Sequence, residues 1–249
     1  MTQINRVLVV GATGSIGRIV VEEALKQKLT VYALVRDPLR VNFESNVRLI
    51  HGDLTKALTL EAVDAVIFAQ GSYDSEMAES VDYNGVRNVL FALKGKVKRL
   101  ALMTSIYATA ERENSRWKRR SERLVRASGV PYTIIRPSWF DHNQADELTL
   151  VVAQNDDRYH YTFTAQDGGV SRRQIGEVLV RSLQTVNATD RTVELFSVKG
   201  DRTTDFEALF ADALVDRKQD NFDGINDPNN LPLSPEPERV LRDLAVITT

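Results

Sequence analysis

A glycine-rich turn near the start of the chain constrains the fold more than any other feature. The turn, GATGSIG at 11–17, directly follows the apolar run RVLVV at 6–10, and residues 15–26 then carry apolar side chains at helical spacing. Glycine permits backbone angles that a Cβ disfavours and lets an anionic ligand approach the N-terminus of a helix. A strand, a glycine turn and a helix in this order are typical of a dinucleotide pyrophosphate site; the alternative is a tight turn without a ligand. The residues expected to bind are Gly11, Thr13, Gly14, Ser15 and Ile16.

Strands and helices alternate through the first half of the chain. Apolar runs predict strands at 6–10, 30–35, 47–50, 65–69, 100–103 and 132–135, and helical periodicity predicts helices at 15–26, 80–93 and 115–128. Such alternation implies right-handed crossovers and a mostly parallel sheet. The predicted fold class is α/β, a doubly wound parallel sheet of the Rossmann type with a small C-terminal substrate-side region.

Beyond Pro137 the alternation becomes less regular. The pattern predicts short strands at 148–152, 159–164 and 192–198, a helix at 171–183 with Ser171 as N-cap, and a helix at 205–215. Residues 216–238 are polar and rich in Pro, Asp and Asn, which predicts an irregular, partly disordered surface segment, whereas 239–247 are apolar enough to pack back. We therefore expect an NAD(P)-binding domain at 1–215, with substrate-side elements at about 138–215, and a polar C-terminal segment at 216–249.

Composition excludes several classes of function. The 249 residues include 34 acidic and 32 basic side chains, and the formal net charge of -2 gives no global attraction for nucleic acid or an anionic membrane. The absence of cysteine excludes disulfides, thiolate zinc sites and cysteine nucleophiles, and the three histidines show no metal-ligand spacing. No apolar run approaches the ~20 residues that a membrane span needs, and no secretory signal is evident. We expect a cytoplasmic protein without a metal, and without nucleic acid or membrane as partner.

The end of the second predicted strand bears on the choice of cofactor. Sites specific for NAD usually place a carboxylate there, but this chain has Arg36, whose guanidinium can pair with the 2′-phosphate of NADP. Arg18 and Arg40 would add positive charge nearby. Asp37 follows directly and keeps NAD as an alternative. We therefore predict NADP as the cofactor; the competing interpretation of Arg36 is a solvated loop arginine.

Several spaced motifs together resemble one family. These are the turn GATGSIG at 11–17, ALVRDP at 33–38, HGDL at 51–54, AQG at 69–71, VDYNG at 81–85, SGVPYTIIRP at 128–137 and VSR at 170–172. Over residues 7–183 the chain resembles the atypical short-chain dehydrogenase/reductases, in particular the NmrA-like, NAD(P)-binding branch. The resemblance implies that Asp53, with Leu54, contacts the adenine, and that Asn84 supports the active site. It also implies a cofactor cleft lined by Ala69, Gln70, Gly71, Pro137 and Ser138. Trp139 and Phe140 are candidate walls of a substrate pocket, and core packing is the alternative for both.

The same resemblance indicates where this chain departs from its family. Ser105 would polarise the substrate carbonyl and Lys118 would hold the nicotinamide ribose, but the position four before Lys118, where active members have Tyr, is Asn114. An amide cannot act as a general acid near neutral pH. Tyr107 is the nearest replacement hydroxyl in sequence, and packing in its loop is the alternative. The catalytic candidates are Ser105, Tyr107 and Lys118.

The predicted helix at 115–128 is crowded with cations. We expect a solvated outer face rather than a nucleic-acid patch for Arg116, Arg119, Arg120, Arg123 and Arg126. Lys118 shares a different stripe with Ser121, Glu122 and Val125 by the i+3/i+4 rule, which places it nearer the cleft. The alternative is a surface lysine paired with Glu122.

Two functions follow as hypotheses. The first is an NADPH-dependent oxidoreductase acting on a small organic acceptor: a carbonyl, or, given Asn114, a quinone or flavin that needs little acid catalysis. The alternative is a non-catalytic NADP-sensing protein of the NmrA-like type that binds a protein partner or forms a homodimer. A relative of the nucleotide-sugar epimerases is a third, weaker hypothesis, since that class also depends on the Tyr.

Overall fold

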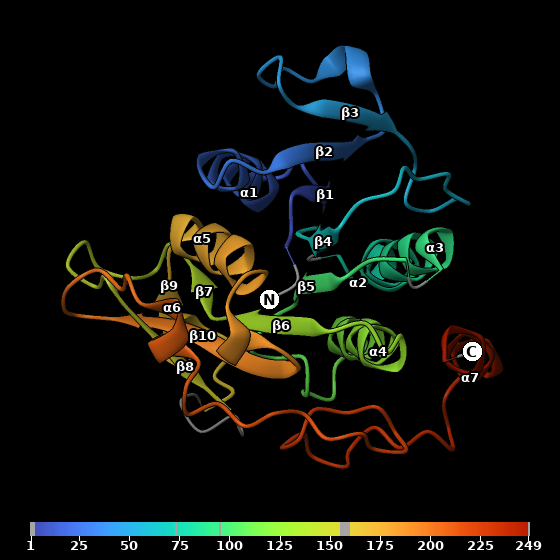
Figure 1. The fold of residues 1–249 in the computed structure, drawn as a ribbon. Helices are drawn as coiled ribbons and strands as arrows, with labels where there is room; N and C mark the ends of the chain where they lie inside the picture. Colours follow the sequence, from blue (N-terminus) through green and yellow to red (C-terminus); the bar gives the residue numbers. More distant parts are fainter. Residues whose placement is uncertain (1–2, 73, 95, 155–159, 249) are drawn as a thin grey trace.

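A central sheet of eight strands organises the part of the chain that the computed structural model describes, residues 3–72, 74–94, 96–154 and 160–248 (Figure 1). Seven strands run parallel and the last is antiparallel to its neighbour. Their order is β3 (Arg48–His51), β2 (Thr30–Val35), β1 (Arg6–Val10), β4 (Ala65–Phe68), β5 (Arg99–Met103), β6 (Tyr132–Pro137), β10 (Arg191–Val198) and β8 (Thr149–Ala153). The chain winds outward in both directions from β1, so the sheet is doubly wound as predicted.

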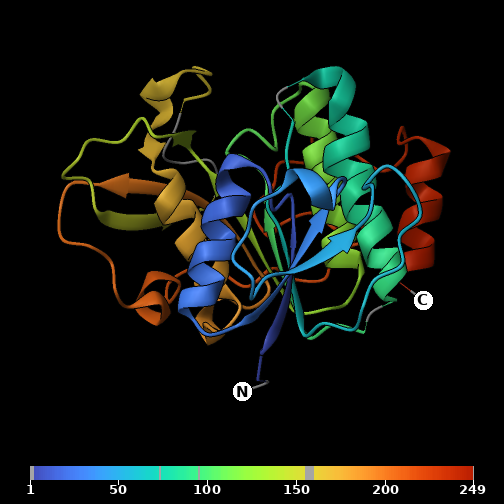
Figure 2. The ribbon, with the colours of Figure 1, turned by 90° about the horizontal axis from the view of Figure 1, so that it is seen from above.

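Helices cover both faces of the sheet (Figures 1 and 2). One face carries α1 (Ser15–Lys26) and α5 (Arg172–Ser182), and the other carries α3 (Asn84–Leu93) and α4 (Glu113–Ala127). The C-terminal helix α7 (Glu238–Ile247) packs outside α3 and α4, which confirms that this stretch docks back on the domain. The remaining elements are short: α2 (Ser75–Ala78), α6 (Phe206–Leu209) and a parallel pair formed by β7 (Trp139–Phe140) and β9 (Gly169–Val170).

The register of the sheet decides where the site forms. Val10 pairs with Phe68, and Met103 pairs with Ile135. The carboxyl ends of β1, β4, β5 and β6 therefore meet at one edge, so that the loops following them open side by side. In an open parallel sheet this edge, at the point where the strand order reverses, is where ligands bind.

Most helices and strands were predicted correctly from local sequence patterns. The predicted strands of the first half lie within about two residues of the observed ones. Ser171 caps α5 as expected: its hydroxyl accepts from the Gln174 N–H at 3.2 Å, and the Gln174 side chain accepts from the Ser171 N–H at 2.9 Å. These two reciprocal bonds form a capping box.

The prediction of one regular helix at 80–93 is wrong about where the helix begins and about its continuity. Helical structure begins five residues earlier with α2, because Asp74 caps it by accepting from the Glu76 N–H at 2.9 Å. A π turn, Glu79–Tyr83, then separates α2 from α3. The hydrophobic spacing at 81–93 does not report this widened turn.

Two further predictions, a helix at 205–215 and a strand at 159–164, differ from the observed structure. The helix predicted at 205–215 ends at Leu209, and farther along the side chain of Gln154 donates to the carbonyl of Leu214 and accepts from its N–H, which holds residue 214 in a non-helical conformation. The strand predicted at 159–164 is absent over 160–164, and Tyr159 lies outside the described residues. There the carboxylate of Asp167 gathers the N–H groups of His160 and Phe163, each at 3.0 Å, and bends the chain.

The arginine-rich face of α4 is buried, so the prediction of a solvated face is wrong for most of its members. Arg119 and Arg123 are 1% and 0% exposed. They are covered by residues 216–237, called here the C-terminal segment, which crosses beneath β6 and α4 on its way to α7 (Figure 1). This segment is irregular, as expected, but it is packed against the helix.

The carboxylates of the C-terminal segment explain that burial. Asp223 accepts two bonds from Arg119 and two from Arg123, all between 2.8 and 3.0 Å. Glu236 accepts from Arg120 at 2.7 Å and from Arg123 at 2.9 Å. Buried charges of this kind are tolerated only when they are paired and hydrogen-bonded. The acidic residues that made the C-terminal segment resemble a disordered stretch therefore neutralise the arginines of α4.

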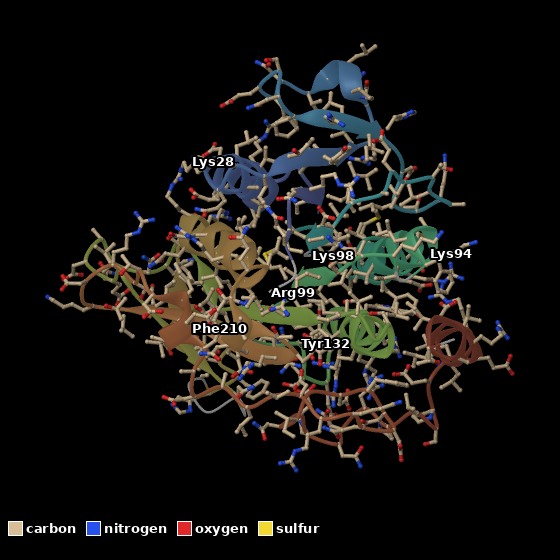
Figure 3. All side chains as sticks on the ribbon, viewed as in Figure 1. Lys28, Lys94, Lys98, Arg99, Tyr132 and Phe210 are labelled. Carbon is tan, nitrogen blue, oxygen red and sulfur yellow. The ribbon has the colours of Figure 1, made fainter. Side chains whose placement is uncertain are left out.

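The same network reaches the sheet. Arg136 on β6 bonds to both Glu122 of α4 and Asp227 of the C-terminal segment, and these two carboxylates hold its pKa well above the ordinary value despite burial. The hydroxyl of Tyr132, labelled in Figure 3, donates to Asp216 at 3.0 Å. The C-terminal segment is thus bonded to α4 and to β6.

Candidate functional site

A cleft of about 910 Å³ opens at the carboxyl edge of the sheet. Its volume lies at the upper end of the range typical of small-molecule and cofactor sites. The residues predicted to bind the cofactor or to act in catalysis all line it: Gly11, Thr13, Gly14, Ser15, Ile16, Arg36, Asp53, Leu54, Ala69, Gln70, Gly71, Ser105, Tyr107, Lys118, Pro137 and Ser138. The structure thus brings these residues together in one place, while their individual roles stay predictions.

The glycine turn has the backbone geometry that an anion site requires. Gly11 has φ +78°, and an added Cβ would lie 2.7 Å from the Gln70 backbone nitrogen. At Gly17 an added Cβ would lie 2.0 Å from the Gly11 carbonyl oxygen, so α1 can begin this close to the turn only with glycine there. No side chain caps α1 at Gly14, and its first turn holds no acidic residue. Its N–H groups therefore remain available for a pyrophosphate, and the turn fits the predicted ligand.

The end of the cleft beside β2 favours Arg36 over Asp37. Arg36 lines the cleft. Asp37 is occupied elsewhere: it accepts from the Leu39 N–H at 3.1 Å and pairs with Arg40 Nε at 3.1 Å. Arg40 is thereby directed to Asp37 and does not line the cleft. The carboxylate of Asp53 faces this region, and hydrogen bonds from Thr55 hold its pKa below the ordinary value.

Two buried polar atoms near the middle of the cleft lack partners within the described part of the protein. They are Oε1 of Gln70 and Oγ of Ser138, whose residues are 8% and 3% exposed. Buried polar atoms are normally hydrogen-bonded, and leaving one unpaired costs about 1–3 kcal/mol. Both residues line the cleft, so a polar group of a bound ligand can satisfy them. The donor and acceptor set here fits the amide and hydroxyl groups of a nicotinamide riboside.

Lys118 projects from α4 into the cleft, as its helical stripe predicted. The alternative, a surface lysine paired with Glu122, is wrong: Glu122 is buried and bonded to Thr104 at 2.7 Å and to Arg136. Lys118 Nζ donates instead to Asp82 Oδ2 at 2.8 Å. Burial raises the pKa of Asp82, and the charge of Lys118 opposes that rise. Asn84, expected to support the active site, does not line the cleft and accepts from Arg239 at 3.4 Å.

Three aromatic side chains that line the cleft, Tyr107, Trp139 and Phe163, lie together and are called here the aromatic wall. The Tyr107 hydroxyl donates to Asp167 at 2.8 Å and accepts from the Trp139 indole N–H at 2.7 Å. Burial and the carboxylate of Asp167 raise the pKa of Tyr107 above its ordinary value. The rings of Tyr107 and Phe163 lie 4.6 Å apart. The rings are inclined to one another, by 70° for Tyr107 and Trp139 and by 41° for Tyr107 and Phe163, and the phenol of Tyr107 is already hydrogen-bonded.

Asn114 occupies the position where the resemblance places the missing tyrosine. It lines the cleft at the start of α4, and its side-chain oxygen accepts from the Ser115 N–H at 2.9 Å. Ser105, at the end of β5, lines the same region. The lining of the cleft therefore includes a serine hydroxyl, a lysine ammonium and, at position 114, an amide.

The cleft residues that were not predicted from the sequence include Arg112, Phe163 and Arg172. The Arg112 guanidinium lies 3.4 Å from the centroid of the Phe163 ring. Arg172, at the start of α5, donates from Nε to Ser15 Oγ at 3.2 Å and pairs with Asp141. Arg172 belonged to a motif already noted, VSR at 170–172, so its cation at the opening of a helix was a usable signal. Arg112 and Phe163 lie in loops that carry no such signal.

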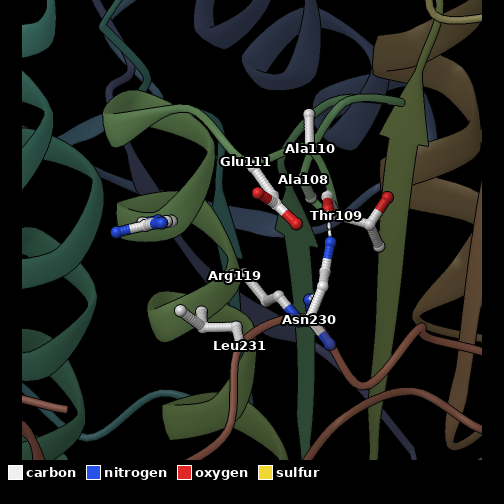
Figure 4. A pocket seen from close by; sticks show the side chains of 8 residues that line it. Ala108, Thr109, Ala110, Glu111, Arg119, Asn230 and Leu231 are labelled. Carbon is white, nitrogen blue, oxygen red and sulfur yellow. Dashed lines mark hydrogen bonds between the residues drawn. The ribbon is translucent and has the colours of Figure 1, made fainter. Parts of the chain in front are cut away.

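The loop after β5, which lines part of the cleft, is hydrogen-bonded to the C-terminal segment. Figure 4 shows the Asn230 side chain reaching toward Thr109, and Leu231 also lines this small pocket. The Asn230 side-chain amide donates to the Thr109 carbonyl at 2.7 Å, and Arg119 donates to the Asn230 side-chain oxygen. The loop that carries Ser105 and Tyr107 therefore rests on a segment more than 100 residues away in sequence.

This fold and this cleft define a Rossmann-type protein that binds a nicotinamide dinucleotide. The sequence model of the NAD(P)H-binding family matches residues 11–185, and the chain belongs to that family. The match confirms the family resemblance that the motifs indicated. Within the described residues, no helix combines the length and apolar character that crossing a membrane requires.

Known proteins of several kinds are similar to this chain. It is 29% identical over 151 residues to sanguinarine reductase of Eschscholzia californica, a match that covers 55% of this chain and 54% of that protein. It is 27% identical over 199 residues to the photosystem II assembly factor Ycf39 of Synechocystis, covering 75% of this chain and 61% of Ycf39. Among solved structures, a wide-type short-chain dehydrogenase/reductase of Veillonella parvula in complex with NADP has a TM-score of 0.57 at 16% identity, covering 82% of this chain and 100% of that one. The chain spans about half to three fifths of the length of these two sequence relatives.

Proposed function

We propose that this chain is an NADPH-dependent reductase that transfers hydride to a small planar organic acceptor. One observation carries the proposal: the glycine turn, Arg36, Lys118 and the aromatic wall face a single cleft. The resemblance to a protein named as a reductase, sanguinarine reductase, supports the class of reaction.

Each part of the cleft has a distinct task in this proposal. The N–H groups at the start of α1 hold the pyrophosphate, and Arg36 pairs with the 2′-phosphate. Lys118 holds the hydroxyls of the nicotinamide ribose. The bound reduced dinucleotide supplies the hydride, while the protein supplies orientation and electrostatics. The aromatic wall positions the acceptor and excludes water from it.

The missing tyrosine narrows the class of acceptor. Asn114 cannot supply a proton, and the Tyr107 hydroxyl is bonded to Asp167 and Trp139 with a raised pKa. Ser105 can still donate a hydrogen bond to an acceptor oxygen. Acceptors that need little acid catalysis, such as quinones and flavins, therefore fit better than simple ketones. Their aromatic rings can also pack against individual rings of the wall formed by Tyr107, Trp139 and Phe163.

The test is oxidation of NADPH against a panel of quinones, flavins and carbonyl compounds. We expect steady turnover with planar quinones or flavins, and lower turnover with NADH in place of NADPH. Variant Trp139→Ala should raise KM for the acceptor while leaving Kd for NADPH unchanged. Absence of turnover across the whole panel would refute the reductase proposal.

A second candidate function is a non-catalytic NADP sensor of the NmrA-like type. Asn114 in place of the proton donor supports it, as does the similarity to a protein named as an assembly factor, Ycf39. In that case the chain binds NADPH without turnover, and its affinity for a protein partner or a second copy changes with the dinucleotide. Affinity capture with and without NADP, followed by measurement of the captured partner's Kd, tests this candidate.

The lack of cysteine is compatible with a reducing compartment such as the cytoplasm, which we propose for either function.

A further inference from the structure

Asp82 is a buried carboxylate beside the cleft lysine. It is 5% exposed, and the Lys118 side chain is 14% exposed. Lys118 Nζ donates to Asp82 Oδ2 at 2.8 Å, and the Ser72 N–H donates to Asp82 Oδ1 at 3.2 Å. Each oxygen of the carboxylate is thus used, one by the lysine and one by the loop after β4.

The π turn Glu79–Tyr83 sets the direction of this carboxylate. Asp82 faces Lys118, whereas the next residue, Tyr83, is directed to α7, where its hydroxyl donates to Asp243 at 2.9 Å. Single π turns inside helices are rare and are frequent at functional sites. Here the widened turn lets neighbouring residues serve the cleft and the packing of α7.

The pair lies at the boundary of the cleft. Lys118 lines the cleft, and Gly71 lies beside the pair: an added Cβ there would be 3.6 Å from Asp82 Oδ1 and 3.8 Å from Lys118 Nζ. A buried ion pair contributes little net stability, because desolvation offsets most of its attraction. A purely structural contact at this position would be served equally well by apolar side chains. A charged pair at the cleft boundary instead presents an ammonium in a fixed place.

We propose that Asp82 is a positioning residue that fixes the ammonium of Lys118 toward the nicotinamide ribose of the bound dinucleotide. Asp82 touches neither cofactor nor acceptor; it acts through Lys118. Position 114 holds asparagine rather than tyrosine, and the carboxylate of Asp82 restrains the Lys118 side chain. This inference rests on the proposed dinucleotide function.

The experiment measures binding by calorimetry with two ligands, NADPH and adenosine 2′,5′-bisphosphate, which lacks the nicotinamide riboside. We expect Asp82→Asn to weaken NADPH binding about tenfold, the size expected when one charge-assisted hydrogen bond is lost. Binding of adenosine 2′,5′-bisphosphate should be unchanged, because it does not reach Lys118. In a Lys118→Met background, Asp82→Asn should have no further effect on NADPH.

The matched control is Glu79→Gln, an acid-to-amide change on the same π turn. Glu79 pairs with Arg239 at 2.6 Å and does not line the cleft, so NADPH binding should stay at the wild-type value. Thermal unfolding checks that each variant is folded, and Asp82→Ser, with a smaller side chain, replaces the Asn variant if that one is not. Equal losses for both ligands, additive effects with Lys118→Met, or unchanged NADPH binding would each overturn the role of Asp82. Absence of NADPH binding in the wild type would instead refute the proposed function.

Discussion

The side-chain amide of Asn230 donates to the backbone carbonyl of Thr109 at 2.7 Å, although 121 residues separate the two. Thr109 lies in the loop that follows β5, and this loop contributes Ser105 and Tyr107 to the cleft (Figure 4). Thr109 Oγ1 also lies 2.7 Å from the Tyr161 hydroxyl. The bond from Asn230 therefore connects the C-terminal segment to the substrate side of the cleft.

We expect Asn230→Ala to loosen this loop. Amide hydrogen exchange at 105–112 should become faster, since local opening is easier where a buried carbonyl has lost its partner. KM for the acceptor should rise several-fold while Kd for NADPH stays near the wild-type value, because the phosphate turn lies on other elements. Asn229→Ala, an exposed neighbour on the same segment, is the control and should change neither quantity. Unchanged exchange at 105–112 in Asn230→Ala would contradict the connection.

The cofactor side of the cleft could be predicted from the sequence because its signals are local. A strand, a glycine turn and a helix occupy 21 consecutive residues, from Arg6 to Lys26, and the parallel sheet then brings the other strand ends to the same edge. The inward placement of Lys118 followed from helical spacing alone. The partner of Lys118 could not be predicted in this way. Glu122 lies on the same stripe of the helix, but it is hydrogen-bonded to Arg136 on β6, a contact that only the packed structure reveals.

The substrate side and the C-terminal segment could not be predicted in the same way. The cations of α4 looked solvated because nothing near them in sequence neutralises Arg119 and Arg123. Their partners, Asp223 and Glu236, lie about 100 residues later in a stretch whose composition resembles a disordered tail. Burial of a charged face depends on such distant complementarity, and neither hydrophobic periodicity nor composition reports it. Arg112 and Phe163 were missed for a related reason, since loops carry no periodic signal.

Arg36 tests the choice between NADP and NAD. Arg36→Ala should weaken NADPH binding about tenfold or more and leave NADH binding nearly unchanged, because only NADPH carries the 2′-phosphate that a guanidinium pairs with. Calorimetry with both dinucleotides measures this. Arg40→Ala is the matched control, since Arg40 is directed to Asp37 and should affect both ligands equally little. Equal losses for NADPH and NADH in Arg36→Ala would exclude the 2′-phosphate assignment.

Asp223 tests the contribution of the C-terminal segment to stability. Asp223→Ala leaves the guanidinium groups of Arg119 and Arg123 buried without their shared carboxylate. Removing one partner of a buried ion pair typically costs about 3–5 kcal/mol. Urea unfolding followed by circular dichroism should show a loss of that size. Arg242→Ala removes an exposed pair with Glu238 on α7 and should change the free energy of unfolding by less than about 0.5 kcal/mol. A similar, small effect of both variants would mean that the segment does not stabilise the fold.

The lowered pKa of Asp227 predicts how the free energy of unfolding depends on pH. Burial acts to raise its pKa, but Arg136, Arg126 and Arg119 outweigh burial and hold the pKa below the ordinary value of 3.8. A carboxyl group whose pKa is lowered by folding stabilises the protein above its unfolded pKa, and that contribution is lost as the pH falls toward the folded value. The free energy of unfolding should therefore decrease steeply below about pH 4.

The variant Asp227→Asn isolates this contribution. It should be less stable than the wild type at pH 7, because Arg136 loses one of its three carboxylate partners, Glu122, Glu194 and Asp227. Its stability should then fall less steeply between about pH 4 and pH 2, since the group that takes up the proton is gone. Urea unfolding across that pH range measures both slopes. Since the acid-labile bonds join the C-terminal segment to β6 and α4, hydrogen exchange on α4 should accelerate over the same interval in the wild type. Parallel slopes for the two proteins would show that Asp227 does not link protonation to unfolding.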